Sequence, residues 1–252
     1  MRRIKITVSY DGTSFHGWQV QPGLPTIQQA LEEVLGNLEG APVAVAGSGR
    51  TDAGVHALAQ VAACSIANPI PCDNLRRALN RYLPPAIRIL SAEEAAQNFH
   101  PRFDAIAKTY EYRIFREELL DPFQYRYTHH HPYPLDEAAM IATAPLLAGE
   151  HDFSAFAASD DRDDLGKSKV RLIFSSHMER NADSLIYRVR GSGFLKHMVR
   201  NLAGFLIETG KRNAGPERLR ELLTPGNPTK AGVTVPAKGL FLVSVEYSAR
   251  VF

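Results

Sequence analysis

The chain contains very little cysteine and no long apolar run. Its 252 residues include only Cys64 and Cys72, which form no CxxC pair. This spacing argues against a cysteine zinc cluster or a disulfide scaffold. No apolar run reaches the roughly 18 residues that a membrane-spanning helix requires. Residues 1–8 pass directly from basic residues into strand-like alternation, without the apolar core of a signal peptide. We therefore expect a cytoplasmic globular protein.

The chain also has little net charge, but the charge is unevenly distributed. The formal net charge is +2, yet residues 76–116 hold eight Lys and Arg against four acids. Residues 186–220 hold eight against two, whereas residues 117–164 hold eleven acids and two arginines. Separate basic stretches in a balanced chain indicate a basic surface patch that can bind nucleic acid. Solvated helix faces are the alternative, and charge alone does not distinguish the two.

The periodicity of residues 1–105 predicts the order β-α-β-β-α-β of a ferredoxin-like unit. Apolar alternation predicts strands at residues 4–10, 43–46, 57–66 and 87–90. Thr26 and Gln29 match a capping box that starts one helix. Asp73 is expected to cap a second helix, which Pro84 stops.

Residues 106–252 follow the same plan less regularly. Strands are predicted at residues 106–115, 170–178, 185–190 and 239–247. Helices are predicted at residues 136–147, with a break at Pro145, and along an apolar stripe from residue 195 to 206, with Gly210 at the C-cap. A short helix should begin at Pro216. We therefore predict an α+β protein with two ferredoxin-like subdomains, 1–105 and 106–252, whose sheets lie side by side with a cleft between them.

The most informative segment is residues 47–62, which contains Gly-Ser-Gly-Arg-Thr-Asp-Ala-Gly-Val-His. Glycine lets the backbone bend sharply or approach a ligand closely, so Asp52 stands on a turn that is suited to chemistry. A carboxylate there is a base, a nucleophile or a metal ligand. The alternative is an aspartate that only closes an Asx-turn.

Two other side chains are candidates for the same site. Arg200 lies at the edge of an apolar helix stripe, where an arginine needs a partner. A carboxylate across the cleft would hold it, although a snorkelling surface arginine is the alternative. Tyr110 and Tyr112 alternate with cations on one strand and face the same side. An exposed ring there can stack on an extruded base, unless both tyrosines belong to the core.

The run of histidines at residues 129–131 is a weaker signal. Consecutive side chains point in different directions and no acidic cluster is adjacent, so we predict a polar loop. A metal-dependent hydrolase built on this run and the acids at residues 160–164 is one rival function. A module that binds RNA without altering it is another.

Six segments in order resemble the tRNA pseudouridine synthase A family. They are residues 10–19, 47–62, 108–112, 149–153, 193–201 and 236–240. The resemblance implies a cofactor-independent isomerase that converts uridine to pseudouridine at positions 38, 39 and 40 of the tRNA anticodon stem-loop. It implies that Asp52 is the essential aspartate, as nucleophile or as base. It also implies that Arg200 pairs with Asp52 and that Tyr110 stacks on the flipped uracil.

The resemblance further implies how RNA is held. Arg50 would approach the RNA backbone or fill the space that the uridine vacates. The remaining candidates are Thr51 and His56 for the substrate and Lys108, Lys196 and His197 for the RNA backbone. The family is homodimeric, so tRNA and a second copy of the chain are the expected partners. No metal site and no cofactor are expected.

Overall fold

The chain folds into two compact units. The computed structural model describes residues 1–159, 168–227 and 229–248. Unit 1 comprises Met1–Lys108 and the C-terminal segment from Phe241, and unit 2 comprises Thr109–Leu240. The sequence placed the boundary at residue 105 and assigned the C-terminal strand to the second unit. From Phe241 onward that strand groups with unit 1, where Phe241 pairs with His56 and Leu242 pairs with Ala57.

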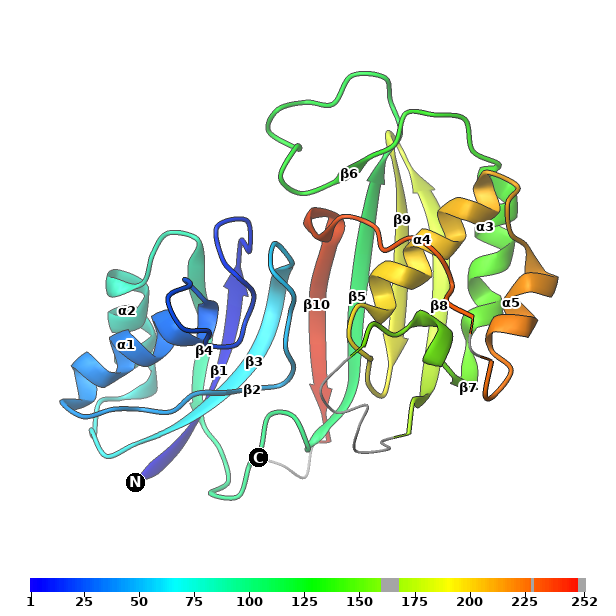
Figure 1. Ribbon diagram of the computed structural model, residues 1–252. Helices are drawn as coiled ribbons and strands as arrows, with labels where there is room; N and C mark the ends of the chain where they lie inside the picture. The colour runs from blue at the N-terminus through cyan, green and yellow to red at the C-terminus, as the bar shows by residue number, and fades with distance from the viewer. Residues whose placement is uncertain (160–167, 228, 249–252) are drawn as a thin grey trace. The chain divides into compact units, whose positions relative to one another are not determined.

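Unit 1 is a sheet with two helices. Its elements in order are β1 (Arg2–Tyr10), α1 (Ile27–Glu39), β2 (Ala46–Gly47), β3 (His56–Ile66), α2 (Cys72–Tyr82) and β4 (Ile87–Glu94). Strand β1 lies between β4 and β3 and is antiparallel to both. Strand β2 pairs with β3, and β10 (Leu240–Tyr247) joins β3 in parallel. Helices α1 and α2 lie side by side (Figure 1).

Local signals explain most element boundaries in unit 1. Thr26 caps α1, because its side chain accepts a hydrogen bond of 3.3 Å from the Gln29 amide. Gly40 ends the helix in the left-handed conformation, as glycine permits. Two predictions were wrong. Pro71, not Asp73, precedes α2, and Asp73 lies in its first turn. Strand β2 is shorter and later than the predicted residues 43–46.

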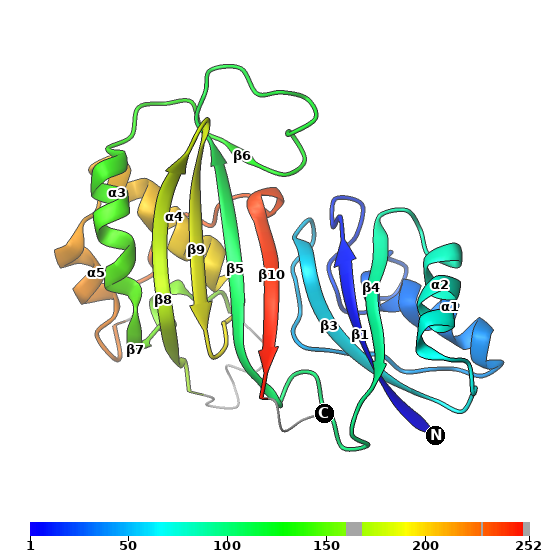
Figure 2. The ribbon, with the colours of Figure 1, turned by 180° about the vertical axis from the view of Figure 1, so that it is seen from behind.

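Unit 2 is built on the strands that follow from β5 (Ala105–Phe115), a strand that begins in unit 1. The order of its main strands is β5, β9 (Ser184–Gly191), β8 (Val170–Asn181) and β7 (Gly149–Asp152). The helices are α3 (Glu137–Thr143), α4 (Met198–Gly210) and α5 (Pro216–Leu222), with the 3₁₀ turns η1 (Ala144–Leu147), η2 (Ser154–Phe156) and η4 (Ala237–Gly239). Figures 1 and 2 show α4 across one face of these strands.

The helix predictions for unit 2 were right about position and partly wrong about ends. Pro145 ends α3, and the chain continues as η1. Pro216 is the first residue of α5, as predicted. Helix α4 begins at Met198, so residue 195 precedes it. Gly210 is its last helical residue, and Lys211 takes the C-cap position.

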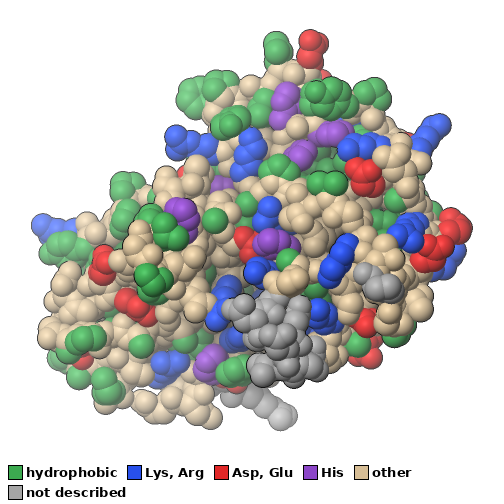
Figure 3. All heavy atoms as spheres, viewed as in Figure 1, with side chains coloured by type: hydrophobic (Ala, Val, Ile, Leu, Met, Phe, Trp, Pro, Cys, Tyr) green, Lys and Arg blue, Asp and Glu red, His purple; other side chains and the backbone are tan. Residues whose placement is uncertain are grey.

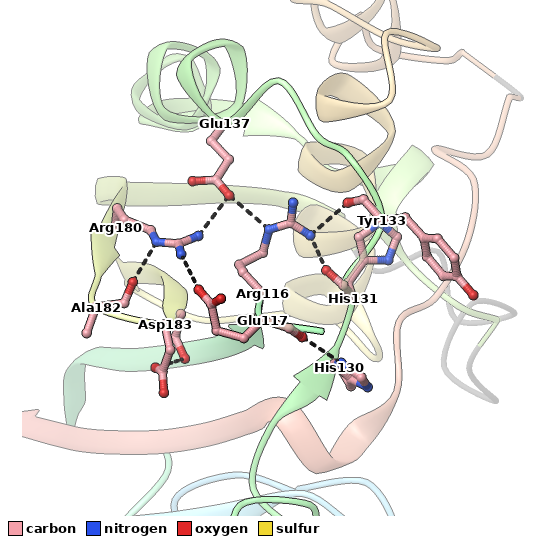
Figure 4. Close-up of polar contacts among 10 residues, drawn as sticks. Arg116, Glu117, His130, His131, Tyr133, Glu137, Arg180, Ala182 and Asp183 are labelled. Carbon is pink, nitrogen blue, oxygen red and sulfur yellow. Dashed lines mark hydrogen bonds and ion pairs between the residues drawn. The ribbon is translucent and has the colours of Figure 1, made fainter. Parts of the chain in front are cut away.

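His129 and His130 form a short strand instead of the predicted polar loop. β6 (His129–His130) pairs in parallel with the end of β5. The Arg116 guanidinium donates hydrogen bonds to the carbonyl oxygens of His131 and Tyr133 and forms an ion pair of 2.9 Å with Glu137 (Figure 4). Sequence reasoning missed this strand because the groups that hold it, the end of β5 and the Arg116 guanidinium, come from outside the histidine run.

The loop between β5 and β6 presents apolar side chains to solvent. Leu119, Phe123 and Tyr125 are strongly exposed, and hydrophobic side chains are visible on top of unit 2 in Figure 3. None of the helices within the described ranges is both long enough and apolar enough to cross a membrane.

Candidate active site

Asp52 lies between β2 and β3. Figure 1 shows the loop that joins these two strands. The Val55 amide donates to the Asp52 carbonyl oxygen at 3.1 Å, which closes the turn. Gly54 has φ +78°, a left-handed conformation that side-chain-bearing residues rarely adopt. The Asp52 side chain is half-buried. The glycine-rich segment thus forms the bend predicted for it.

The loop that follows β1 packs directly against the backbone of this turn. A Cβ atom at Gly12 would lie 2.1 Å from the Val55 carbonyl oxygen. Gly17 has φ +87°, and a Cβ atom there would lie 2.5 Å from the Thr51 carbonyl oxygen. The Trp18 amide donates to that same oxygen at 3.1 Å. The two loops therefore hold each other through their backbones, at a distance that only glycine allows.

Thr51 and His56 have buried side chains with partners inside the protein. The Thr51 hydroxyl, in a residue 7% exposed, lies 2.9 Å from the hydroxyl of Tyr10, which is 3% exposed. His56 is 1% exposed. Its Nδ1 accepts a hydrogen bond of 3.1 Å from the Gly12 amide, and its ring stacks on Phe241. These contacts connect the two ends of the turn to Tyr10 and to Gly12.

Two more side chains hold the backbone just before Asp52. The Ser48 hydroxyl donates to Gln60 Oε1 at 2.5 Å, and Gln60 Nε2 donates to the Gly49 carbonyl oxygen at 3.0 Å. Lys108 Nζ donates to the Ser48 carbonyl oxygen at 2.6 Å. Burial, with a smaller effect from the charge of Arg102, lowers the pKa of Lys108 to about 8.

Gln60 was missed by the sequence analysis, although the sequence contains a signal for it. This amide stands within the apolar residues of β3 and is fully buried. A buried amide must find hydrogen-bond partners, and the glycine-rich turn that precedes the strand offers a hydroxyl and backbone carbonyl oxygens. An amide inside an apolar strand next to such a turn therefore indicates a clamp on the turn.

Arg200 is the third residue of α4 and is half-buried. Its Nε donates to the Val235 carbonyl oxygen at 2.8 Å. The Tyr112 hydroxyl donates to the next carbonyl oxygen, that of Pro236, also at 2.8 Å. The two side chains thus fix the segment that leads into η4. His197 occupies the N-cap position of α4 with φ +59°. Lys196, the residue before it, is exposed.

Tyr110 and Tyr112 both belong to the buried face of β5, as strict alternation requires. Tyr112 is fully buried, whereas Tyr110 is 8% exposed. The rings of Tyr110 and Phe194 pack nearly perpendicular, with centroids 5.0 Å apart. The packing fixes the plane of the Tyr110 ring.

The metal-hydrolase alternative requires several ligand side chains around one ion. Within residues 1–159, 168–227 and 229–248, no three His, Cys, Asp or Glu side chains gather as a metal site would require. The acids at residues 160–164, which this alternative also uses, lie outside the described residues. His129 Nδ1 and His131 Nε2 are buried without a hydrogen-bond partner, and burial lowers the pKa of His129 to about 4.

The predicted site residues divide between the two units. Unit 1 holds Arg50, which is exposed, together with Thr51, Asp52, His56 and Lys108. Unit 2 holds Tyr110, Lys196, His197 and Arg200. The predicted pair of Asp52 and Arg200 joins different units and stays a prediction.

A family profile and individual relatives both indicate the same family for this chain. The sequence profile of a family described as tRNA pseudouridine synthase matches residues 6–104 and 143–248. A protein of Solibacter usitatus (strain Ellin6076) named tRNA pseudouridine synthase A is 66% identical over 247 residues, which cover 98% of this chain and 100% of the relative. Proteins of the same name from Brevibacillus brevis and Pelobacter propionicus are 42% and 44% identical, with the same coverage.

Proposed function

Because this chain belongs to the tRNA pseudouridine synthase family, we propose that it converts uridine to pseudouridine at positions 38, 39 and 40 of the tRNA anticodon stem-loop. It is an isomerase that acts on uridine in tRNA. The observation that carries the assignment is the 66% identity to a tRNA pseudouridine synthase A along 98% of the chain. The choice of the anticodon stem-loop rests on the motif resemblance.

The reaction exchanges one glycosidic bond for another. The bond from C1′ to N1 of uracil breaks, a bond from C1′ to C5 forms, C5 loses a proton and N1 gains one. Nothing is oxidised or reduced. The target base must leave the stack, at a cost of a few kcal/mol that contacts to the RNA backbone offset. Asp52, raised on its anchored turn, acts on the uridine as nucleophile or as base.

Arg200 and Tyr110 complete the proposed chemistry. A planar guanidinium pairs well with a carboxylate and keeps it ionised, which is the role proposed for Arg200 toward Asp52. The flipped uracil stacks on Tyr110, whose ring plane is held by Phe194. Thr51 and His56 shape the uridine pocket by supporting the turn, consistent with their burial.

Basic side chains near both groups are proposed to contact RNA. Arg50 lies in the Asp52 turn and is exposed. Lys196 before α4 is exposed, and His197 at the N-cap of α4 is half-buried. A homodimer in the cytoplasm, working without cofactor or metal, would present two such surfaces to one tRNA. A ferredoxin-like topology of unit 1 is supported by its strand order β4-β1-β3 with β2 beside β3.

The test is to incubate the purified protein with an unmodified tRNA transcript, without metal or nucleotide. Pseudouridine is then mapped by carbodiimide-dependent stops in primer extension, for wild type and Asp52→Asn. We expect stops at positions 38–40 for wild type only, unchanged by EDTA, with equal tRNA binding by both proteins. Substantial activity of Asp52→Asn would remove Asp52 from the chemistry. Binding without any stops would instead favour an RNA-binding module.

A further inference from the structure

The turn that carries Asp52 requires external support. Residues 48–55 belong to no helix or strand, and Gly49 and Gly54 add backbone freedom. Catalytic groups must be held to about 0.5 Å, and a misplacement of about 1 Å can cost on the order of 100-fold in rate. The groups that hold this backbone are therefore part of what makes Asp52 effective.

Backbone oxygens on both sides of Arg50 are held from outside the turn. The Thr51 carbonyl accepts from the Trp18 amide at 3.1 Å, and the Gly49 carbonyl accepts from Gln60 at 3.0 Å. The Ser48 carbonyl accepts from Lys108 at 2.6 Å. Of these three donors only Lys108 is charged, and a charge-assisted hydrogen bond is about twice as strong as a neutral one.

We propose that Lys108 is a positioning residue, which holds the Asp52 turn through the Ser48 carbonyl and does not contact an RNA phosphate. This inference rests on the proposed function and deepens it. The ammonium group is directed at a backbone oxygen, and a Cβ atom at Gly49 would lie 3.1 Å from Nζ. The absence of a side chain at Gly49 thus leaves room for the ammonium beside the turn.

Lys108 shares its strand with Tyr110, the residue proposed to stack on uracil. Lys108 belongs to β5, and Tyr110 follows two residues later on the same strand. One strand therefore carries both the anchor of the Asp52 turn and the tyrosine proposed to stack on uracil. Burial lowers the pKa of Lys108 to about 8, as expected for an ammonium withdrawn from solvent.

The test compares Lys108→Met with Lys108→Arg on an anticodon stem-loop RNA. Kinetics give kcat and KM, and binding at several salt concentrations gives Kd and its salt dependence. For Lys108→Met we expect kcat to fall about 10- to 100-fold, with Kd within about twofold of wild type and an unchanged salt slope. Lys108→Arg keeps a charged donor and should recover most of kcat. The control is Lys5→Met, which removes another partly buried lysine of unit 1, paired with Glu93.

The opposite pattern would overturn the proposal. If Lys108→Met raises Kd several-fold, lowers the salt slope by about one and keeps kcat at saturating RNA, Lys108 contacts a phosphate. Wild-type rates for Lys108→Met would exclude both roles. An inactive wild-type protein would refute the proposed function instead, so the two failures are distinct. If Lys108→Met does not fold, Gly49→Ala tests the same contact from the turn. It should lower kcat a few-fold without changing Kd, and an unchanged kcat would count against the anchor.

Discussion

The hydrogen bond between Tyr10 and Thr51 offers a quantitative test of how the Asp52 turn is held. The two hydroxyl oxygens lie 2.9 Å apart, and the residues are 3% and 7% exposed. Burial raises the pKa of Tyr10, so its hydroxyl stays protonated at neutral pH. Tyr10→Phe removes one partner and leaves the Thr51 hydroxyl buried with one contact fewer. A buried hydrogen bond contributes about 1 kcal/mol, and an unsatisfied group costs about 1–3 kcal/mol.

We therefore expect Tyr10→Phe and Thr51→Val each to lower the free energy of unfolding by about 1–2 kcal/mol. The double variant should lose about 1 kcal/mol less than the sum, because the second substitution removes a group that already lacks its partner. Urea unfolding of the four proteins measures this coupling. Tyr10→Phe should also reduce kcat, since the hydroxyl steadies the residue next to Asp52.

The control pair is Thr51→Val with Tyr187→Phe. Tyr187 is also fully buried, and its hydroxyl lies 3.1 Å from that of Ser176 in unit 2. Its loss should add to that of Thr51→Val within about 0.5 kcal/mol. If Tyr10→Phe and Thr51→Val are equally additive, the hydroxyls do not stabilise each other and the proposed tie between β1 and the turn is refuted.

Three further predictions follow from the same geometry. Gly12→Ala places a methyl group 2.1 Å from the Val55 carbonyl oxygen, so the turn must shift; we expect kcat to fall more than tenfold while tRNA binding, measured by filter retention, persists. Burial lowers the pKa of His129 to about 4, so the contribution of this histidine to the free energy of unfolding should be constant above pH 6.5 and should fall as the pH drops toward 4. At pH 5 this contribution should be smaller by on the order of 2 kcal/mol. Urea unfolding at both pH values should therefore show a loss of stability in wild type that is smaller by this amount in His129→Phe. Tyr110→Phe keeps the ring and should retain most activity, whereas Tyr110→Leu should lose far more; equal rates would contradict stacking.

Local patterns predicted most elements because the energies involved are local. Strand β1 follows from the alternation of Ile4, Ile6 and Val8, which are all fully buried. The start of α1 follows from the Thr26 cap, and the end of α3 from Pro145. Each signal acts within a few residues of the feature that it predicts.

The incorrect predictions concern strands that are held by residues outside their own segment of the chain. β6 forms because Arg116 and Glu137 fix the chain around it, and neither is adjacent to the histidines in sequence. The C-terminal strand groups with unit 1 from Phe241 onward, and Phe241 pairs opposite His56 although most of the chain separates them. Contacts at this separation leave no periodicity in the sequence, so no local pattern predicts them.

The candidate site divides in the same way. The sequence alone determined that Asp52 stands on a glycine-rich turn, since the residue types of residues 47–54 permit little else, and it determined the family through six ordered segments. Only the tertiary structure decided that Thr51 and His56 face inward, and that Gln60 and Lys108 hold the turn. The reason is that a residue's type limits which bonds it can make, whereas the fold determines which partner lies within reach.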